Sequence, residues 1–458
     1  MPIDTSSKSY RNKILFVACL SSSLVPFMGS SLNLALPQLA REFDLSGIEQ
    51  SWILTAYLLS TAILQVPFGR LADIWGKRNV FIAGLCIFAV TTTLCGFAPN
   101  GVILITLRAL QGIGSAMVFC TNTAILTTVF PPKERGTAMG INVATVYISI
   151  AAGPSIGGII TQYFGWEYVF LITAVIALIA LTGALIVMKD KWAESKGEPF
   201  DAKGSVIYGL AVMALIYGLT ILPGIGGFAL IAASGLLLWL FFRHESREAF
   251  PVFNISLLTK NRTFRMSSTA ALINYAATFP IGFLVSLYLQ EVKGLNAQSA
   301  GLILIIQPII QSVLSPFAGK LSDKIQPRFI ASSGMALITI ALLIIALFIT
   351  PDSPLILLMV LLGVLGVGFA LFSSPNTNAI MGSVEKKYYS MASATTGTVR
   401  LVGQAFSMGI TTMIISLTIG SRAITPEVSA ELMSVIHITF IIFAVICAFG
   451  VYTSIVRD

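Results

Sequence analysis

The chain has 458 residues, of which 56% are hydrophobic and only 10% are charged, and its net charge is +8. A soluble protein of this length could not bury so much apolar surface, so much of the chain must face lipid, and a soluble basic face for nucleic acid is excluded. Because backbone groups inside a bilayer must be paired internally, only helices or closed barrels remain. Continuous apolar runs such as residues 329–349 and 436–451 lack the alternation of barrel strands and therefore predict helices.

Fourteen apolar segments follow one another along the chain, each long enough to cross a hydrocarbon layer of about 30 Å. The predicted spans are 14–37, 50–72, 79–98, 102–127, 136–161, 167–188, 204–222, 226–243, 264–290, 298–318, 328–349, 354–380, 390–418 and 432–455. The short Gly-rich link at residues 223–227 predicts a tight hairpin between the seventh and eighth spans.

The lysines and arginines support this count and predict an orientation. With the N-terminus in the cytoplasm, 23 of the 28 basic residues fall in inner segments, whereas only Arg41, Lys293 and Arg422 fall in outer loops. This asymmetry follows the positive-inside rule. It predicts a multi-pass protein of the cytoplasmic membrane with both termini in the cytoplasm.

A loop motif occurs twice, at an offset of 250 residues. The loop after the second span reads Gly69-Arg-Leu-Ala-Asp-Ile-Trp-Gly-Lys-Arg78, and the loop after the tenth reads Gly319-Lys-Leu-Ser-Asp-Lys-Ile-Gln-Pro-Arg328. Two matched loops predict two six-helix halves, 1–190 and 264–458, joined by a linker, 191–263, that carries two additional spans. The candidate conformational latch consists of Gly69, Arg70, Asp73, Lys77, Arg78, Asp323 and Arg328. The alternative is a basic loop that only sets topology.

Arg108 lies within the fourth span, where a charge costs at least about 2.5 kcal/mol at mid-membrane. It should therefore face the bundle interior, with Gln111, Thr121, Asn122 or Asn33 as partners; the alternative is a side chain that snorkels to the interface.

Polar and aromatic residues deep in the central spans are candidates for the substrate cavity, although each could equally form a hydrogen bond between helices. They are Asn33, Tyr57, Gln65, Gln111, Asn142, Tyr147, Asn274, Tyr275, Gln307, Gln311, Phe372, Asn376 and Gln404.

Other chemistries lack their signatures. The five cysteines lie in apolar runs without a CxxC or a Cys/His cluster, which predicts neither disulfides nor a metal site. There is no GxxxxGK[ST] loop for ATP, and neither a catalytic cluster nor a selectivity ring is apparent. We expect no enzyme activity and no cofactor.

Several motifs resemble those of the major facilitator superfamily, in particular its fourteen-helix drug:proton antiporters. They are Gly69–Arg78, Arg108–Gly114 (RALQGIG), Gly153–Gly158 (GPSIGG), Tyr288–Gly294 (YLQEVKG) and Arg400–Gly403 (RLVG). The resemblance covers essentially the whole chain. It implies an all-α membrane fold of two six-helix bundles, with drug efflux by proton antiport through alternating access. It also implies that Gly153, Pro154, Gly157 and Gly158 seal the interface between the halves.

The chain departs from this family at the first span, where Met28 occupies the position of an aspartate, and no acidic residue lies at mid-membrane. Glu167 and Glu291, at span ends, remain as candidates for proton coupling, and Arg108 and Arg400 as cavity charges. We therefore expect a monomeric exporter of small neutral or anionic amphiphiles, coupled to protons. The alternative is a facilitator or symporter for a small, possibly anionic, metabolite.

Overall fold

The computed structural model describes residues 7–190, 192–193, 195–253, 259–322, 324–384 and 389–456. This part of the chain is helical and contains 14 helices long and apolar enough to cross a membrane. The prediction of an all-α membrane protein with fourteen spans is confirmed.

The first six spans are single helices joined by short turns. They are α1 (Lys8–Glu42), α2 (Gly47–Trp75), α3 (Lys77–Cys95), α4 (Gly101–Val129), α5 (Pro132–Tyr163) and α6 (Glu167–Val187). Local chemistry fixes where they begin and turn. Ser46 and Glu49 form a reciprocal capping box at the start of α2, and Gly76 takes a φ of 100° in the turn to α3, a conformation that a side chain would oppose.

The two additional spans form the hairpin α7 (Ala202–Thr220) and α8 (Ile225–Glu245). Asp201 caps α7 by accepting a hydrogen bond from the Gly204 amide at 2.8 Å, and its carboxylate lies 3.0 Å from His244 Nε2 at the end of α8. Burial raises the pKa of Asp201, but these bonds from Gly204 and His244 outweigh it and hold the pKa below its ordinary value.

The last six spans are more broken. The ninth consists of α10 (Arg262–Thr278), α11 (Pro280–Leu287) and the π-helical turn η1 (Tyr288–Val292), and the tenth consists of α12 (Ala297–Leu304) and α13 (Ile306–Ser322). Pro308 accounts for the second break, since its ring opposes the helical position of the Leu304 carbonyl, where α12 ends. The remaining spans are α14 (Pro327–Phe348), α15 (Leu355–Gly382), α16 (Tyr389–Thr418) and α17 (Ser429–Ile455), which follows the 3₁₀ turn η3 (Pro426–Val428).

The two sets of six spans repeat one packing pattern. A Cβ on Gly84 of α3 would lie 2.9 Å from the Gly114 carbonyl of α4, and a Cβ on Gly334 of α14 would lie 2.6 Å from the Gly368 carbonyl of α15. Glycine lets each helix pair approach backbone to backbone. Gly84 and Gly334 are 250 residues apart, the offset of the repeated loop motif, and their partners Gly114 and Gly368 are 254 residues apart.

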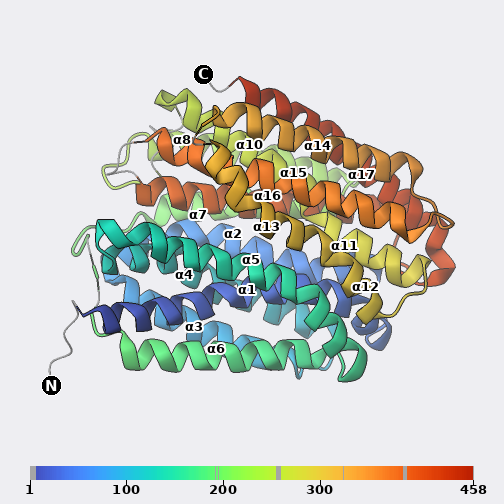
Figure 1. Cartoon of the computed structure of the whole chain (residues 1–458), viewed down its shortest axis with the longest axis horizontal. Coiled ribbons are helices and arrows are strands. Elements are labelled where there is room, and N and C mark those ends of the chain that lie inside the picture. Colours follow the sequence, from blue (N-terminus) through green and yellow to red (C-terminus); the bar gives the residue numbers. More distant parts are fainter. Residues whose placement is uncertain are drawn as a thin grey trace.

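The hairpin joins the two sets. In Figure 1 the blue-to-green helices α1 to α6 form one half of the molecule and α10 to α17 form the other, with α7 between them and both chain ends on the left-hand side. The Tyr208 hydroxyl of α7 donates to the Ala62 carbonyl of α2 at 3.1 Å, and Leu219 of α7 packs against Gly409 of α16. The helix α7 therefore contacts both halves.

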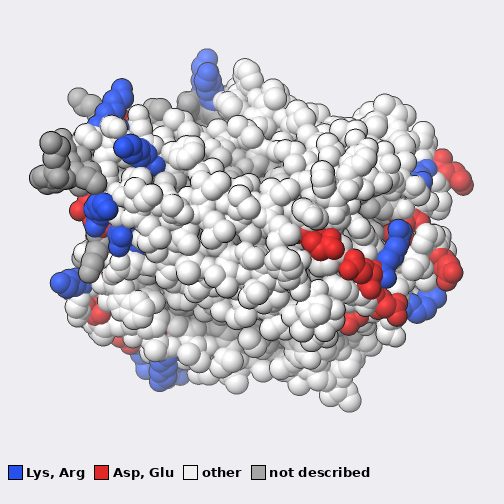
Figure 2. All heavy atoms as spheres, turned by 90° about the horizontal axis from the view of Figure 1, so that it is seen from below, with Lys and Arg blue, Asp and Glu red and all other residues white. Residues whose placement is uncertain are grey.

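On the surface seen in Figure 2, charged side chains lie toward the two ends of the bundle. Figure 2 shows lysines and arginines gathered at the left-hand end, most acidic residues on the face at the right-hand end, and an uncharged belt between them. The basic end carries the start of α1 and the turn between α2 and α3, and the opposite end carries the turn between α1 and α2.

Candidate functional site

The halves are sealed against each other at the opposite end by glycines. A Cβ on Gly158 of α5 would lie 2.5 Å from the Ala297 carbonyl of α12, and a Cβ on Gly301 of α12 would collide with the Pro154 carbonyl of α5. Helices α5 and α12 therefore touch through their backbones, which only residues without side chains permit. The hydroxyl of Tyr163 adds a hydrogen bond to Gln298 across the same contact, at 3.2 Å.

An ion pair crosses the halves at this end. Arg41, near the end of α1, donates from Nη2 to both carboxylate oxygens of Glu291 at 2.7 and 2.8 Å. The Glu291 side chain is completely buried, whereas that of Arg41 is 58% exposed. Glu291 lies in the π-helical turn η1, a departure from α-helical geometry that is often found at functional positions. Ser286 supports the contact by donating to the Asn33 carbonyl at 2.7 Å.

Halfway along the bundle, side chains from both halves meet around Arg400 of α16. The Arg400 guanidinium lies over the ring of Phe119 of α4, 5.6 Å from its centroid. Tyr147 of α5 approaches Ser373 of α15, with 3.3 Å between the two hydroxyl oxygens, and Tyr275 and Arg400 lie in its vicinity. We call Phe119, Tyr147, Tyr275, Ser373 and Arg400 the central cluster. It combines a cation, three aromatic rings and three hydroxyls.

Several buried amide side chains carry polar atoms without a hydrogen-bond partner among the described residues. Both polar atoms of the Asn274 side chain, the Gln65 carbonyl oxygen and the Asn376 carbonyl oxygen are in this position. Gln65 of α2 lies against Gly397 of α16 and so belongs to the interface. Buried polar groups normally find partners, so these amides can serve a polar ligand.

The bundle is more open toward its basic end. A Cβ on Gly140 of α5 or on Gly382 of α15 would have no atom within 4 Å, and Thr377 and Asn378 of α15 are exposed. A cavity of about 510 Å³ beside Asn378 and Arg328 lies at this end within the second half, because its lining residues belong to α10, α14, α15 and the adjoining turns. The backbone contacts between the halves described above lie at the opposite end.

A comparison with family models identifies this architecture. The model of the Major Facilitator Superfamily matches residues 18–408, and again residues 267–457. The chain belongs to this superfamily. Its relatives and structural neighbours are transporters, not enzymes.

Individual relatives transport different compounds. This transporter is 30% identical over 396 residues to the riboflavin transporter RibZ of Clostridioides difficile. The alignment covers 86% of each chain. It is 27% identical to the tetracenomycin C resistance and export protein of Streptomyces glaucescens, over 91% of this chain and 78% of the relative. The multidrug resistance protein Stp of Mycobacterium tuberculosis is also 27% identical, over 83% of this chain and 71% of that one.

A solved structure supports the fold alone. The bacterial homologue of the human lysosomal transporter Spinster, in an inward-facing and unoccupied conformation, has a TM-score of 0.70 to this transporter. The two chains are 16% identical, and the alignment covers 98% of this chain and 97% of the other.

Arg108 lies inside the first half and not in the central cluster. It is 1% exposed, donates to the Ile53 carbonyl at 3.1 Å and to Gln111, and stacks on Tyr57 at 4.3 Å from the ring centroid. The alternative interpretation, in which the Arg108 side chain snorkels to the interface, is therefore wrong. Of the partners expected from the sequence, Gln111 is the one that Arg108 contacts. Gln111 in turn donates to Thr92 of α3 at 2.5 Å, so the network is closed within the half.

The expected cavity residues divide between two environments. The Asn142 side chain accepts a hydrogen bond from the Ser22 hydroxyl at 2.7 Å, within the first half. Phe372 packs against Gly334, within the second half. Residues at or near the interface of the halves, described above, include Asn33, Gln65, Tyr147 and Tyr275. Gln307, Gln311 and Gln404 are half-buried on α13 and α16. Tyr57 is buried and shares a short contact with Ser115, 2.5 Å between hydroxyl oxygens.

The first copy of the loop motif, Gly69–Arg78, contacts the segment between α6 and α7. Arg70 pairs with Glu198 at 2.5 Å, Arg78 donates to the Met188 carbonyl at 2.7 Å, and Lys77 lies 3.8 Å from Asp73. Gly69 faces Cys120 of α4, and Gly319 likewise faces Ser374 of α15. Arg328 lies over the Phe329 ring, and Asp323 falls outside the described residues.

The remaining antiporter-motif glycines pack within the first half. Ser31 of α1 donates to the Gly153 carbonyl at 2.9 Å and also lies against Gly157. Glu167 begins α6 at the opposite end, and its carboxylate lies against Gly165 in the preceding turn.

Sequence reasoning did not find Phe119, Ser373 or the partner role of Arg41. For Arg41 a signal existed, because basic residues are rare in the loops at its end.

Proposed function

We propose that this protein exports small neutral or anionic amphiphiles across the cytoplasmic membrane by alternating access, in exchange for protons, as a monomer whose basic end faces the cytoplasm. The positive-inside distribution supports the orientation. Under this proposal, the backbone contacts between α5 and α12 close the outer side, and the form described here is the inward-facing state. Antibiotic and multidrug exporters among the relatives support the direction of transport.

The central cluster is the observation that carries the proposed substrate class. Its formal charge is positive, from Arg400, and no acidic residue of the chain lies in the middle of a span. The aromatic side chains of Phe119, Tyr147 and Tyr275 offer stacking surfaces, and the unpartnered amides offer hydrogen bonds. A planar, polar, uncharged or anionic molecule satisfies these groups, whereas a quaternary cation would be repelled by Arg400.

Glu291 is the proposed coupling group. It is a fully buried carboxylate held by Arg41 across the halves. A proton taken up by Glu291 from the outer side would remove the charge that attracts Arg41 and loosen the seal. After the substrate has left, the protonated carrier would return inward, and release of this proton to the cytoplasm would restore the ion pair, so that a proton enters for the substrate that leaves.

Transport into inverted vesicles tests this proposal. We compare the accumulation of three probes with and without an inside-acid pH gradient: riboflavin is neutral, fluorescein is anionic and ethidium is cationic. We expect gradient-driven accumulation of the first two, abolished by Arg400→Gln, with little transport of ethidium. Accumulation of ethidium alone, or accumulation that ignores the gradient, would contradict the substrate class or the coupling, respectively.

A facilitator for a metabolite is the second candidate. The observation in its favour is the 30% identity to a riboflavin transporter over most of both chains. Under this alternative, riboflavin equilibrates across vesicles in either direction without a pH gradient, and intact cells that express the protein take it up faster than control cells. Concentrative export would exclude this alternative.

A further inference from the structure

A surface groove between α1 and α6 at the basic end is separate from the central cluster. It has a volume of about 630 Å³ and is open to the side. Its walls are apolar: Phe16 and Ile179 are 62% and 53% exposed, and Leu20 and Val187 complete the lining. Both helices are membrane spans, so this opening faces lipid.

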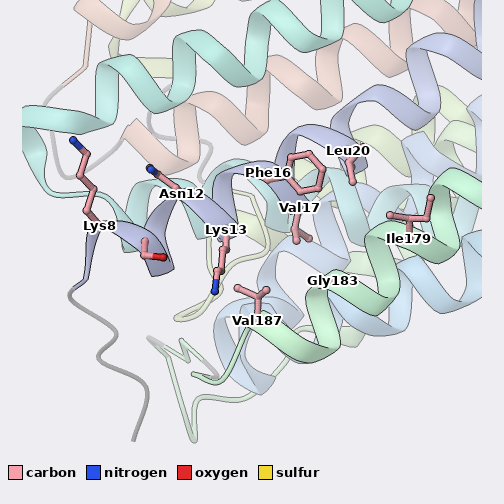
Figure 3. Close-up of a pocket in the computed structure, with 10 residues that line it drawn as sticks. Lys8, Asn12, Lys13, Phe16, Val17, Leu20, Ile179, Gly183 and Val187 are labelled. Carbon is pink, nitrogen blue, oxygen red and sulfur yellow. The ribbon is translucent and has the colours of Figure 1, made fainter. Parts of the chain in front are cut away.

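The groove has a polar rim at one end only. Lys8, Ser9, Asn12 and Lys13 of α1 line it, and none of its lining residues is acidic. Figure 3 shows the Lys13 ammonium close to Val187 at the end of α6, with Val17 of α1 directed toward α6. The first turn of α1 contains no acidic residue, so the positive end of the helix dipole adds to the charge of the two lysines.

The spacing of the rim and the walls matches a lipid. From Lys13 to Leu20 the helix rises by about 10 Å, so the apolar walls extend about that far into the hydrocarbon layer beneath the charged rim. Gly183 lets α6 approach Val17, which closes the floor of the groove, since a Cβ there would lie 2.9 Å from Val17 Cγ2.

We propose that this groove binds one anionic phospholipid, with its phosphate at Lys13 and the upper part of an acyl chain between Phe16 and Ile179. Lys13 and, at the edge of the groove, Lys8 supply charge complementarity, and Ser9 supplies a hydrogen-bond donor to the phosphate. Basic pockets between spans at the cytoplasmic side are suited to anionic headgroups. The bound lipid would connect α1, which carries Arg41 at its other end, to α6. This inference does not depend on which substrate is transported.

Native mass spectrometry of the purified, full-length protein tests the proposal. Dioleoyl phosphatidylglycerol is titrated against dioleoyl phosphatidylcholine, which has the same chains and no net charge. We expect preferential binding of one phosphatidylglycerol, weakened roughly tenfold in the variant Lys8→Gln/Lys13→Gln. The matched control is Lys203→Gln/Lys320→Gln, which removes two exposed lysines from the basic end outside this groove.

A second variant tests the apolar part. Ile179→Trp should fill the groove and weaken the binding of phosphatidylglycerol, while the charged rim stays intact. The inference is overturned if phosphatidylcholine binds equally well, if the lysine variant and its control lose binding equally, or if glycerol 3-phosphate competes as effectively as the lipid, which would indicate a phosphate site without a chain. Monodisperse elution of each variant confirms that it is folded.

Discussion

The substitution Glu291→Gln should shift the transporter toward opening at its opposite end. The two hydrogen bonds from Arg41 end on a carboxylate with no exposed surface, and removing one partner of a buried ion pair can cost about 3–5 kcal/mol. Because the Arg41 side chain is 58% exposed and glutamine keeps one acceptor, we reduce the loss to about 1–2 kcal/mol. This corresponds to a roughly 5- to 30-fold change in the ratio of closed to open forms.

Distance measurements between spin labels can detect this shift. We place labels at the exposed residues Gln162 of α5 and Leu302 of α12, which belong to different halves and flank the glycine contact. In Glu291→Gln, the population with a longer separation should grow at neutral pH relative to the unsubstituted protein.

A matched control lies at the same end. Glu431 pairs with Arg422 at 2.9 Å, and both side chains are partly exposed and belong to the second half. Glu431→Gln should therefore leave the distances unchanged. If Glu291→Gln gives the same distribution as Glu431→Gln and as the unsubstituted protein, the ion pair does not hold the halves together and our reasoning is refuted.

Three further predictions concern other parts of the molecule. Arg108→Lys should lower the melting temperature and the folded yield, because an ammonium cannot reproduce the stacked, two-partner arrangement; an unchanged melting temperature would contradict it. Gly301→Ala should abolish transport and populate the form open at the opposite end, whereas Gly140→Ala, where space is free, should transport normally, and equal activities would refute the steric argument. Asp201→Asn should lower the melting temperature at neutral pH; because the folded pKa is depressed, the difference from the unsubstituted protein should disappear as the pH falls below about 4, and a constant difference would exclude the ionic contribution.

The spans could be predicted because their cause is local. Each apolar run is long enough to cross the hydrocarbon layer, and the positions of basic residues fix how many runs there must be. The predicted ends were less accurate. The sequence predicts the first span at 14–37, whereas α1 runs from Lys8 to Glu42, because a helix continues beyond the apolar stretch as long as its backbone bonds and caps are satisfied.

The partner of Arg108 could also be predicted, for a local reason. Gln111 lies three residues further along the same helix, where side chains are neighbours. The ion pair between Arg41 and Glu291 could not, because its members are 250 residues apart and meet only when the halves dock. The π-helical turn that carries Glu291 has no sequence signal that we recognise.

The two intramembrane arginines show which charges can take part in coupling. Arg108 has its partners in α2 and α4 of its own half, so movement of the halves relative to each other leaves its surroundings unchanged. Arg400 lies over Phe119 of the other half, and Glu291 is held by Arg41 of the other half, so both must change partners when the halves move. A ligand or a proton can shift a conformational equilibrium only through groups whose interactions differ between the two states. Substitutions at Arg400 and Glu291 should therefore alter the coupling of substrate to protons, whereas those at Arg108 should alter stability.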